Sequence, residues 1–142
     1  MLTHNAVPKI YNIPTEGESA NLQAMRDWIQ NIQHPNETIT AVGKLDLIQR
    51  VLSGHDAIEA NSWKLAALGL TLGDALAQAM PGRLKWVMVE DNRGISPALR
   101  WQQTDLLIFP VSAVRERVQA GEPLDIYQVY AEYTKMLPFE SR

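Results

Sequence analysis

The chain has 142 residues, 46% of them hydrophobic, and its 13 basic and 16 acidic residues give a net charge of −3. This length and apolar content predict one domain with a core that needs no metal or disulfide to hold it together. The absence of cysteine excludes disulfides, thiol catalysis and thiolate metal sites, and the mixed charges lack the basic face that is typical of nucleic-acid binders.

The first part of the chain is predicted to be helical after a short arm. Residues 1–14 are polar and bounded by prolines, so we expect an arm that is extended or partly disordered. Thr15 and Glu18 have the spacing of a capping box, which predicts that a helix begins there. A second helix is predicted over residues 40–53, with Gly54 as its left-handed cap.

A third helix, predicted over residues 57–80, is apolar on most of its circumference and should be the hub of the core. Gly69 and Gly73 lie on one face of it, and because glycine lowers helix propensity, we expect another helix or the sheet to pack closely there. Asp74 is the carboxylate in the helix interior. It either lies at the helix edge, reaching solvent or pairing with an arginine, or it is a buried functional acid, and the first interpretation is favoured.

Three strands are predicted next. Residues 84–89 are apolar and aromatic, and a charged turn that ends at Gly94 follows them. Residues 97–102 alternate in polarity, with Ala98 on a polar face that meets water. With a third strand over residues 105–109, the simplest topology is a three-stranded antiparallel meander that helices cover on one face.

Both faces of the first predicted strand are apolar, with Trp86 and Met88 on one and Val87 and Val89 on the other. Either the helices wrap both faces, or one face is an exposed patch of the kind that marks a partner site. Trp101 in the second strand presents the same choice between core and interface.

Two helices, over residues 111–120 and 126–137, are predicted after the strands, and residues 139–142 form a tail. The predicted fold class is therefore α+β. It is a single domain over residues 15–138, with a helical N-terminal half, a central buried helix, a three-stranded antiparallel meander and two C-terminal helices.

Residues 60–135 contain a series of short motifs whose order and spacing are specific in combination. They are Leu68–Leu76, Trp86–Asp91, Gly94, Pro97–Arg100, Phe109–Pro110 and the region of Arg117, Gly121 and Asp125. In this combination the chain resembles a bacterial family of domains of unknown function, number 3806. The resemblance implies a small α+β bacterial domain whose biochemical role is not established, and it gives no catalytic residues. Residues 1–55 lie outside it.

The signatures of common enzymes are missing from the sequence. His4, His34 and His55 lack metal-ligand spacing, so no metal is expected. There is no nucleophile elbow, phosphate loop or dinucleotide fingerprint, and we therefore expect no cofactor and assign no catalytic residue. No apolar run could span a bilayer and the start resembles no secretory signal, which predicts a soluble, cytoplasmic protein.

One charged cluster lies at the predicted hairpin, where Glu90 and Asp91 end a strand near Arg93 and Arg100. It is either a carboxylate pair for acid–base catalysis or a charged turn that keeps the hairpin soluble. The structural interpretation is favoured.

Two functional hypotheses follow. The favoured one is a non-enzymatic protein-binding domain, most concretely a bacterial immunity protein that neutralises a cognate toxin by binding a basic toxin domain. Its candidate contact residues are Glu90, Asp91, Arg93, Arg100, Trp101 and Asp27.

The alternative is a small-molecule-binding domain or an enzyme. Its pocket would lie between the glycine face of the third helix and the hairpin, and would use Asp74, Glu90 or Arg100. A buried Asp74 beside an open cavity would favour this alternative, whereas a flat acidic or aromatic patch would favour the protein-binding domain.

Overall fold

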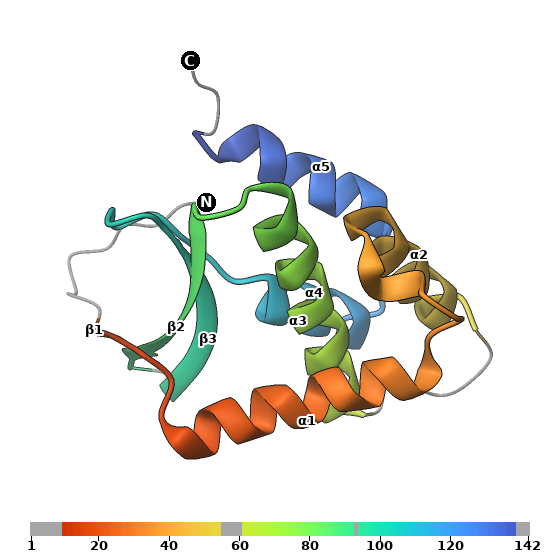
Figure 1. Ribbon diagram of the computed structural model, residues 1–142, viewed down its shortest axis with the longest axis horizontal. Coiled ribbons are helices and arrows are strands. Elements are labelled where there is room, and N and C mark those ends of the chain that lie inside the picture. Colours follow the sequence, from red (N-terminus) through yellow and green to blue (C-terminus); the bar gives the residue numbers. More distant parts are fainter. Residues whose placement is uncertain (1–9, 55–60, 93, 139–142) are drawn as a thin grey trace.

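Helices cover one face of an antiparallel sheet in the computed structural model (Figure 1). The structure describes residues 10–54, 61–92 and 94–138, with the backbone alone for residues 10 and 11. In chain order, the elements are β1 (Ile10–Asn12), α1 (Glu16–Ile32), the 3-10 helix η1 (Glu37–Ile39), α2 (Ala41–Leu52), α3 (Ser62–Ala79), β2 (Leu84–Asp91), β3 (Gly94–Trp101), β4 (Leu107–Ile108), α4 (Pro110–Gln119) and α5 (Ile126–Met136). The predicted α+β class is confirmed.

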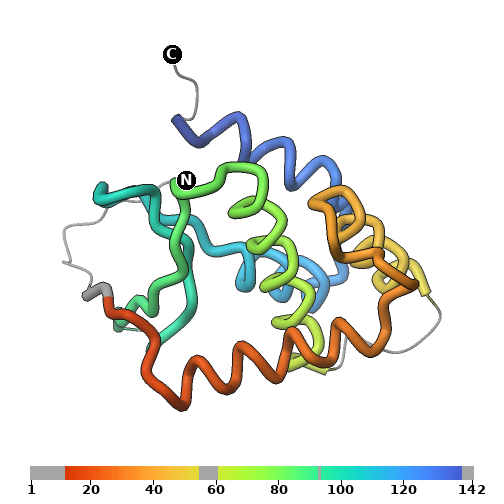
Figure 2. The backbone as a smooth tube through the Cα atoms, in the orientation of Figure 1, coloured from red at the N-terminus to blue at the C-terminus, as the bar shows by residue number. Residues whose placement is uncertain are grey.

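The predicted antiparallel meander is formed by β2, β3 and β4, and the arm adds β1 beside β2. Gly94 ends the turn between β2 and β3 with φ of 122°, a backbone conformation that glycine adopts without steric cost. β3 begins at this glycine, three residues earlier than predicted. β1 then leads into α1, which runs beneath both the sheet and α3 (Figure 2).

Local capping signals set the helix ends. The predicted capping box is confirmed: Glu18 N–H donates to Thr15 Oγ1 at 3.1 Å, and Thr15 N–H donates to Glu18 Oε1 at 2.8 Å. α3 begins at Ser62, later than predicted, because Asn61 caps it by accepting from Lys64 N–H at 2.9 Å. The left-handed cap predicted at Gly54 is wrong, since α2 closes through Ser53 in a right-handed conformation and Gly54 has no positive φ.

The central helix α3 is the hub of the core, as predicted, and it packs against α1, α2 and α4. A Cβ atom at Gly69 would lie 2.5 Å from the Cα of Val111, and one at Gly73 would lie 2.4 Å from the Trp86 ring. Both distances are far shorter than a carbon–carbon contact. The predicted close packing at the glycine face is therefore confirmed, and it involves both a helix and the sheet.

The two faces of the sheet are buried in different ways. Trp86 packs against the main core beneath the helices, whereas Val87, Val89 and Ala98 form a small second cluster on the other face. Leu107 and Phe109 are partly buried against this cluster. The prediction that Ala98 lies on a face that meets water is wrong, because the apolar side chains of the neighbouring strand cover it.

Candidate functional site

The charged residues predicted at the hairpin do not come together. Glu90 is exposed and Asp91 is half-buried, at the turn end of β2, where Asp91 pairs with Gly94. Arg100 lies toward the opposite end of β3, paired with Lys85. Arg93 lies outside the described residues. The hairpin thus offers acidic side chains at one end and basic side chains at the other.

Two further candidate contact residues have different surroundings. Asp27 is exposed on α1 and accepts a hydrogen bond from Gln23 Nε2 at 2.9 Å. Trp101 is buried in the main core, with the Arg83 guanidinium 5.8 Å from its ring centroid. The core alternative therefore holds for Trp101, and its ring is not available to a docking partner.

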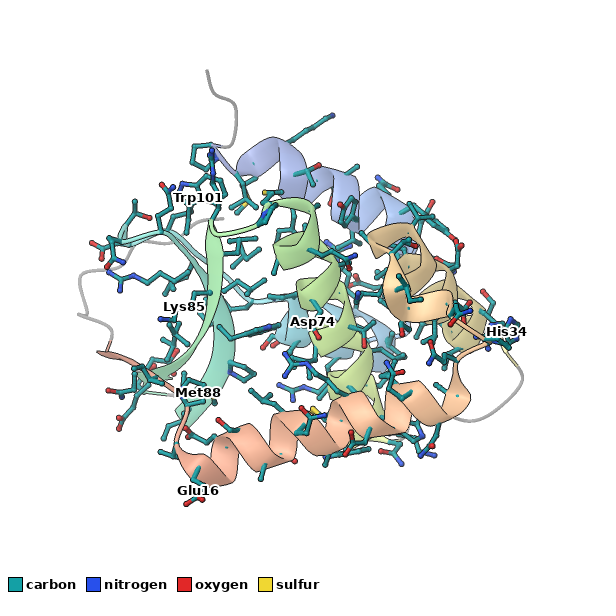
Figure 3. The ribbon with its side chains drawn as sticks, viewed as in Figure 1. Glu16, His34, Asp74, Lys85, Met88 and Trp101 are labelled. Carbon is teal, nitrogen blue, oxygen red and sulfur yellow. The ribbon has the colours of Figure 1, made fainter. Side chains whose placement is uncertain are left out.

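Asp74 of α3 connects this helix to both α1 and β2 (Figure 3). Arg26 of α1 donates through Nε to Oδ2 at 2.8 Å and through Nη2 to Oδ1 at 2.9 Å, and Trp86 of β2 donates through Nε1 to Oδ1 at 3.0 Å. The hydrogen bonds to Asp74 raise the pKa of Arg26, while burial acts in the opposite direction. The arginine-pairing interpretation of Asp74 is confirmed.

A second polar group anchors α2 to α3 beside this network. Lys44 Nζ donates to the carbonyl of Thr38 at 2.8 Å and to the side-chain oxygen of Gln78. Gln78 Nε2 in turn donates to the carbonyl of Ile39 at 2.7 Å. Burial lowers the pKa of Lys44, and the negative charge of Asp74 opposes that effect. These contacts connect η1 and α2 to α3.

The pocket that the alternative hypothesis requires is filled. The Trp86 ring and Pro110 occupy the space against Gly73, and the backbone of Val111 occupies the space against Gly69. Arg26 and Trp86 donate three hydrogen bonds to the two oxygens of Asp74, so this carboxylate already has structural partners. At Gly69 and Gly73 the structure therefore leaves no space for the pocket that the alternative places there.

The structure contains a hollow elsewhere, on the opposite side of the sheet. Its volume is about 150 Å³, and it is lined by Asn12, Ile13, Lys85, Val87, Arg100, Gln102 and Gln103. Neither Asp74 nor Glu90 lines it. Of the residues that the alternative named, Arg100 alone reaches this hollow.

An apolar and acidic surface that was not predicted extends over η1, α2 and α5, where η1 contacts α2 and α2 contacts α5. We call it the α2–α5 surface and define it by Ile39, Val42, Asp46 and Tyr127. As whole residues, Ile39, Val42 and Tyr127 are 65%, 63% and 43% exposed. Val42 and Asp46 are one turn apart on α2, and the Tyr127 hydroxyl donates to Asp46 Oδ1 at 2.5 Å.

Asp46 and Asp125 accept hydrogen bonds from Tyr127, through its hydroxyl and its backbone N–H, while Glu37 forms an ion pair with Arg50 at 2.5 Å. The hydrogen bond to Asp46 raises the pKa of Tyr127, and the charges of Asp46, Asp125 and Glu37 add to the effect. A signal for the surface was present in the sequence. Val42 and Tyr127 are large apolar residues that fall outside the inward-facing stripes of their helices, so their side chains had to face outward.

Within residues 10–54, 61–92 and 94–138, no group of three or more histidine and acidic side chains could hold a metal ion. His34 is exposed, and His4 and His55 lie outside these ranges. No helix in the described part of the chain is long and apolar enough to cross a membrane.

Residues 44–130 match the family described as Domain of unknown function (DUF3806), which is more than half of the chain. The chain belongs to this family. The matched region begins within α2, earlier than the resemblance in the sequence indicated, and it includes the hub helix, the meander, α4 and the first residues of α5. The family description gives no function.

A solved structure shares this fold. It is a crystal structure from Bacteroides thetaiotaomicron VPI-5482 at 1.50 Å resolution, with a TM-score of 0.69 and 18% sequence identity. The similarity covers 92% of this chain but 49% of that one, so the chain spans about half the length of the bacterial protein. No curated protein matches the chain significantly.

Proposed function

We propose that this domain is a non-enzymatic protein-binding domain that docks a basic protein on the α2–α5 surface. The observation that carries the proposal is the combination of exposed Ile39, Val42 and Tyr127 with the carboxylate of Asp46. The most concrete form of the proposal is a bacterial immunity protein that binds and neutralises a cognate toxin in the cytoplasm.

The chemistry of the surface suits a protein partner. Exposed apolar and aromatic side chains that lie together are typical of docking sites, because burying them stabilises a complex. The hydrogen bond from its hydroxyl restricts the Tyr127 ring before any partner arrives, so less side-chain entropy is lost on binding. The neighbouring carboxylates would attract a basic partner and raise the rate of encounter.

The position of the surface relative to the family region supports a partner-specific role. Ile39 and Val42 precede residue 44, where the family match begins, whereas Asp46 and Tyr127 lie within it. A docking face built partly outside the shared region can differ between relatives while the hub and the sheet stay the same. A docking face that varies on a shared scaffold would allow each relative to recognise its own cognate toxin.

Affinity capture from the native cell tests this proposal. The wild type and the double variant Val42→Ser/Tyr127→Ala are each used as bait, and the captured partners are compared. We expect a stoichiometric basic partner with the wild type and its loss with the double variant. Expression of that partner alone should stop growth, and co-expression of the wild-type domain should restore it.

The control is Ile95→Ser, which changes an exposed apolar residue at the start of β3, away from the α2–α5 surface. This variant should retain the partner. Equal capture by the wild type and the double variant would contradict the proposed surface. Absence of a partner, together with a small molecule that raises the melting temperature, would instead support the small-molecule-binding or enzyme hypothesis.

A further inference from the structure

β1 pairs with only part of the outer edge of β2. The register runs from Ile10 opposite Glu90 to Asn12 opposite Met88. Among the described residues, no strand pairs with Leu84–Val87 on this side, although β3 pairs with that segment on the other. The edge of β2 is therefore unpaired over four residues, or about 13 Å.

The backbone groups of Leu84 and Trp86 point toward this open edge. Pro97 lies opposite Met88 and has no N–H, so these two residues cannot exchange the paired hydrogen bonds of an antiparallel ladder. Gln102 N–H donates to the carbonyl of Arg83 at 2.8 Å, which fixes the same alternation. Every second residue of β2, including Leu84 and Trp86, consequently directs its N–H and C=O away from β3.

The sequence explains why β1 stops before this segment. Continuing its register would place Pro14 opposite Trp86, and proline has no N–H to donate to the ladder. The chain instead turns at Thr15 into the capping box of α1. The pairing of β1 with β2 thus ends because of the residues that follow β1, and β2 itself continues beyond this point.

Basic side chains lie next to the open segment. The hollow of about 150 Å³ borders it, and Lys85 and Arg100 lie directly opposite each other within its lining. Figure 3 labels Lys85 on β2. Arg100 donates to the carbonyls of Thr104 at 2.7 Å and Gln103 at 3.1 Å, which hold its guanidinium in place. Lys85 is exposed, and its ammonium has no hydrogen-bond or ion-pair partner in the described part of the chain.

We propose that this open edge and hollow bind an extended acidic segment of a second protein, which adds a strand beside Leu84–Val87. Backbone hydrogen bonds to Leu84 and Trp86 would hold the segment. Directly opposite residues of neighbouring strands share a face, so an acidic residue opposite Lys85 would lie over the hollow and meet the Lys85–Arg100 pair. This site is separate from the α2–α5 surface and does not depend on it.

Titration of the ¹⁵N-labelled protein with a seven-residue peptide in which threonine alternates with glutamate tests the proposal. At about 1 mM peptide, the amide signals of Leu84–Val87 should shift. A peptide with lysine in place of glutamate should not shift them. No change at these amides with the acidic peptide, or equal binding of the two peptides, would overturn the proposal.

Methylated peptides test the geometry of strand addition. Threonine N–H groups should face β2 when the glutamates lie over the hollow, so N-methylation of the threonines should abolish binding. N-methylation of the glutamates should leave binding in place, because those N–H groups point away from β2. Binding that survives threonine methylation would contradict strand addition.

Lys85→Glu tests the charge preference without penalising the fold, since it places opposite charges across β2 and β3. It should weaken binding of the acidic peptide roughly fivefold or more. Arg117→Glu, on the exposed side of α4, makes the same change in net charge and should have little effect. Equal losses in both variants would show that net charge alone controls binding and would overturn the proposed site.

Discussion

Arg26 and Asp74 are 48 positions apart in the chain and form a two-pronged ion pair with N–O distances of 2.8 and 2.9 Å. The pair connects α1 to the hub helix, and Trp86 connects the same carboxylate to the sheet. One side chain thus fixes the relative positions of a helix, the hub and a strand. The side chain of Asp74 is 22% exposed, so water weakens the contribution of the ion pair to the free energy of unfolding.

Removal of this charge should loosen the connection without unfolding the protein. Asp74→Asn retains the shape of the side chain but gives Arg26 a neutral partner, and we expect a loss of about 1–3 kcal/mol in the free energy of unfolding. Denaturant titration measures it. In a double-mutant cycle with Arg26→Ala, a coupling energy near zero would mean that the ion pair has no role in stability.

The close contact at Gly73 predicts a large effect of added volume. Gly73→Leu should lower the free energy of unfolding by about 2–4 kcal/mol, because the Trp86 ring that it meets is also held by Asp74. The matched control is Gly17→Ala on α1, where a Cβ meets nothing within 4 Å. That change should be neutral or stabilising. A melting temperature within one degree of the wild type for Gly73→Leu would refute the close contact.

Stability at alkaline pH should depend on Tyr127. Its hydrogen bond to Asp46 raises the pKa of the folded state above the ordinary value of about 10. The folded protein therefore favours the neutral phenol. The contribution of this phenol to the free energy of unfolding is fully present below about pH 10, and it disappears as the pH rises through the folded-state pKa. Tyr127→Phe should have a shallower loss of stability above pH 10 in pH-dependent denaturant titrations. Identical slopes for the two proteins would disprove the link.

The acidic end of the hairpin predicts an effect on association rate. Glu90→Lys/Asp91→Lys should change stability by no more than about 0.5 kcal/mol, because turn charges contribute little. If Glu90, Asp91 and Asp27 help to steer a basic partner, the double reversal should slow association and weaken its salt dependence. Stopped-flow mixing at low and high salt measures both. Association rates that match the wild type at every salt concentration would exclude the hairpin from steering.

Features that depend on neighbouring residues in sequence could be predicted. The capping box of Thr15 and Glu18 forms as expected, because its partners are three residues apart. The glycine face of α3 also gave a correct prediction, since glycine in a buried helix is unfavourable unless something packs closely against it. The sequence did not indicate which elements would fill that space.

Features that depend on contacts between residues far apart in the sequence could not be predicted. β1 is three residues long and exists only beside β2, so no periodic pattern marks it. Alternation describes one strand at a time and therefore predicts a solvent face for Ala98, whereas its burial comes from Val87 and Val89 of the neighbouring strand β2. The α2–α5 surface likewise requires Asp46 and Tyr127, 81 positions apart, to meet.

The central claim is that the α2–α5 surface binds a protein partner, and the dissociation constant of the captured partner tests it most directly. Isothermal titration should give a constant at least about tenfold weaker for Val42→Ser/Tyr127→Ala than for the wild type, because exposed apolar and aromatic anchors dominate binding energy. Ile95→Ser should remain within about twofold of the wild type. A double variant that binds as tightly as the wild type and Ile95→Ser would contradict the account.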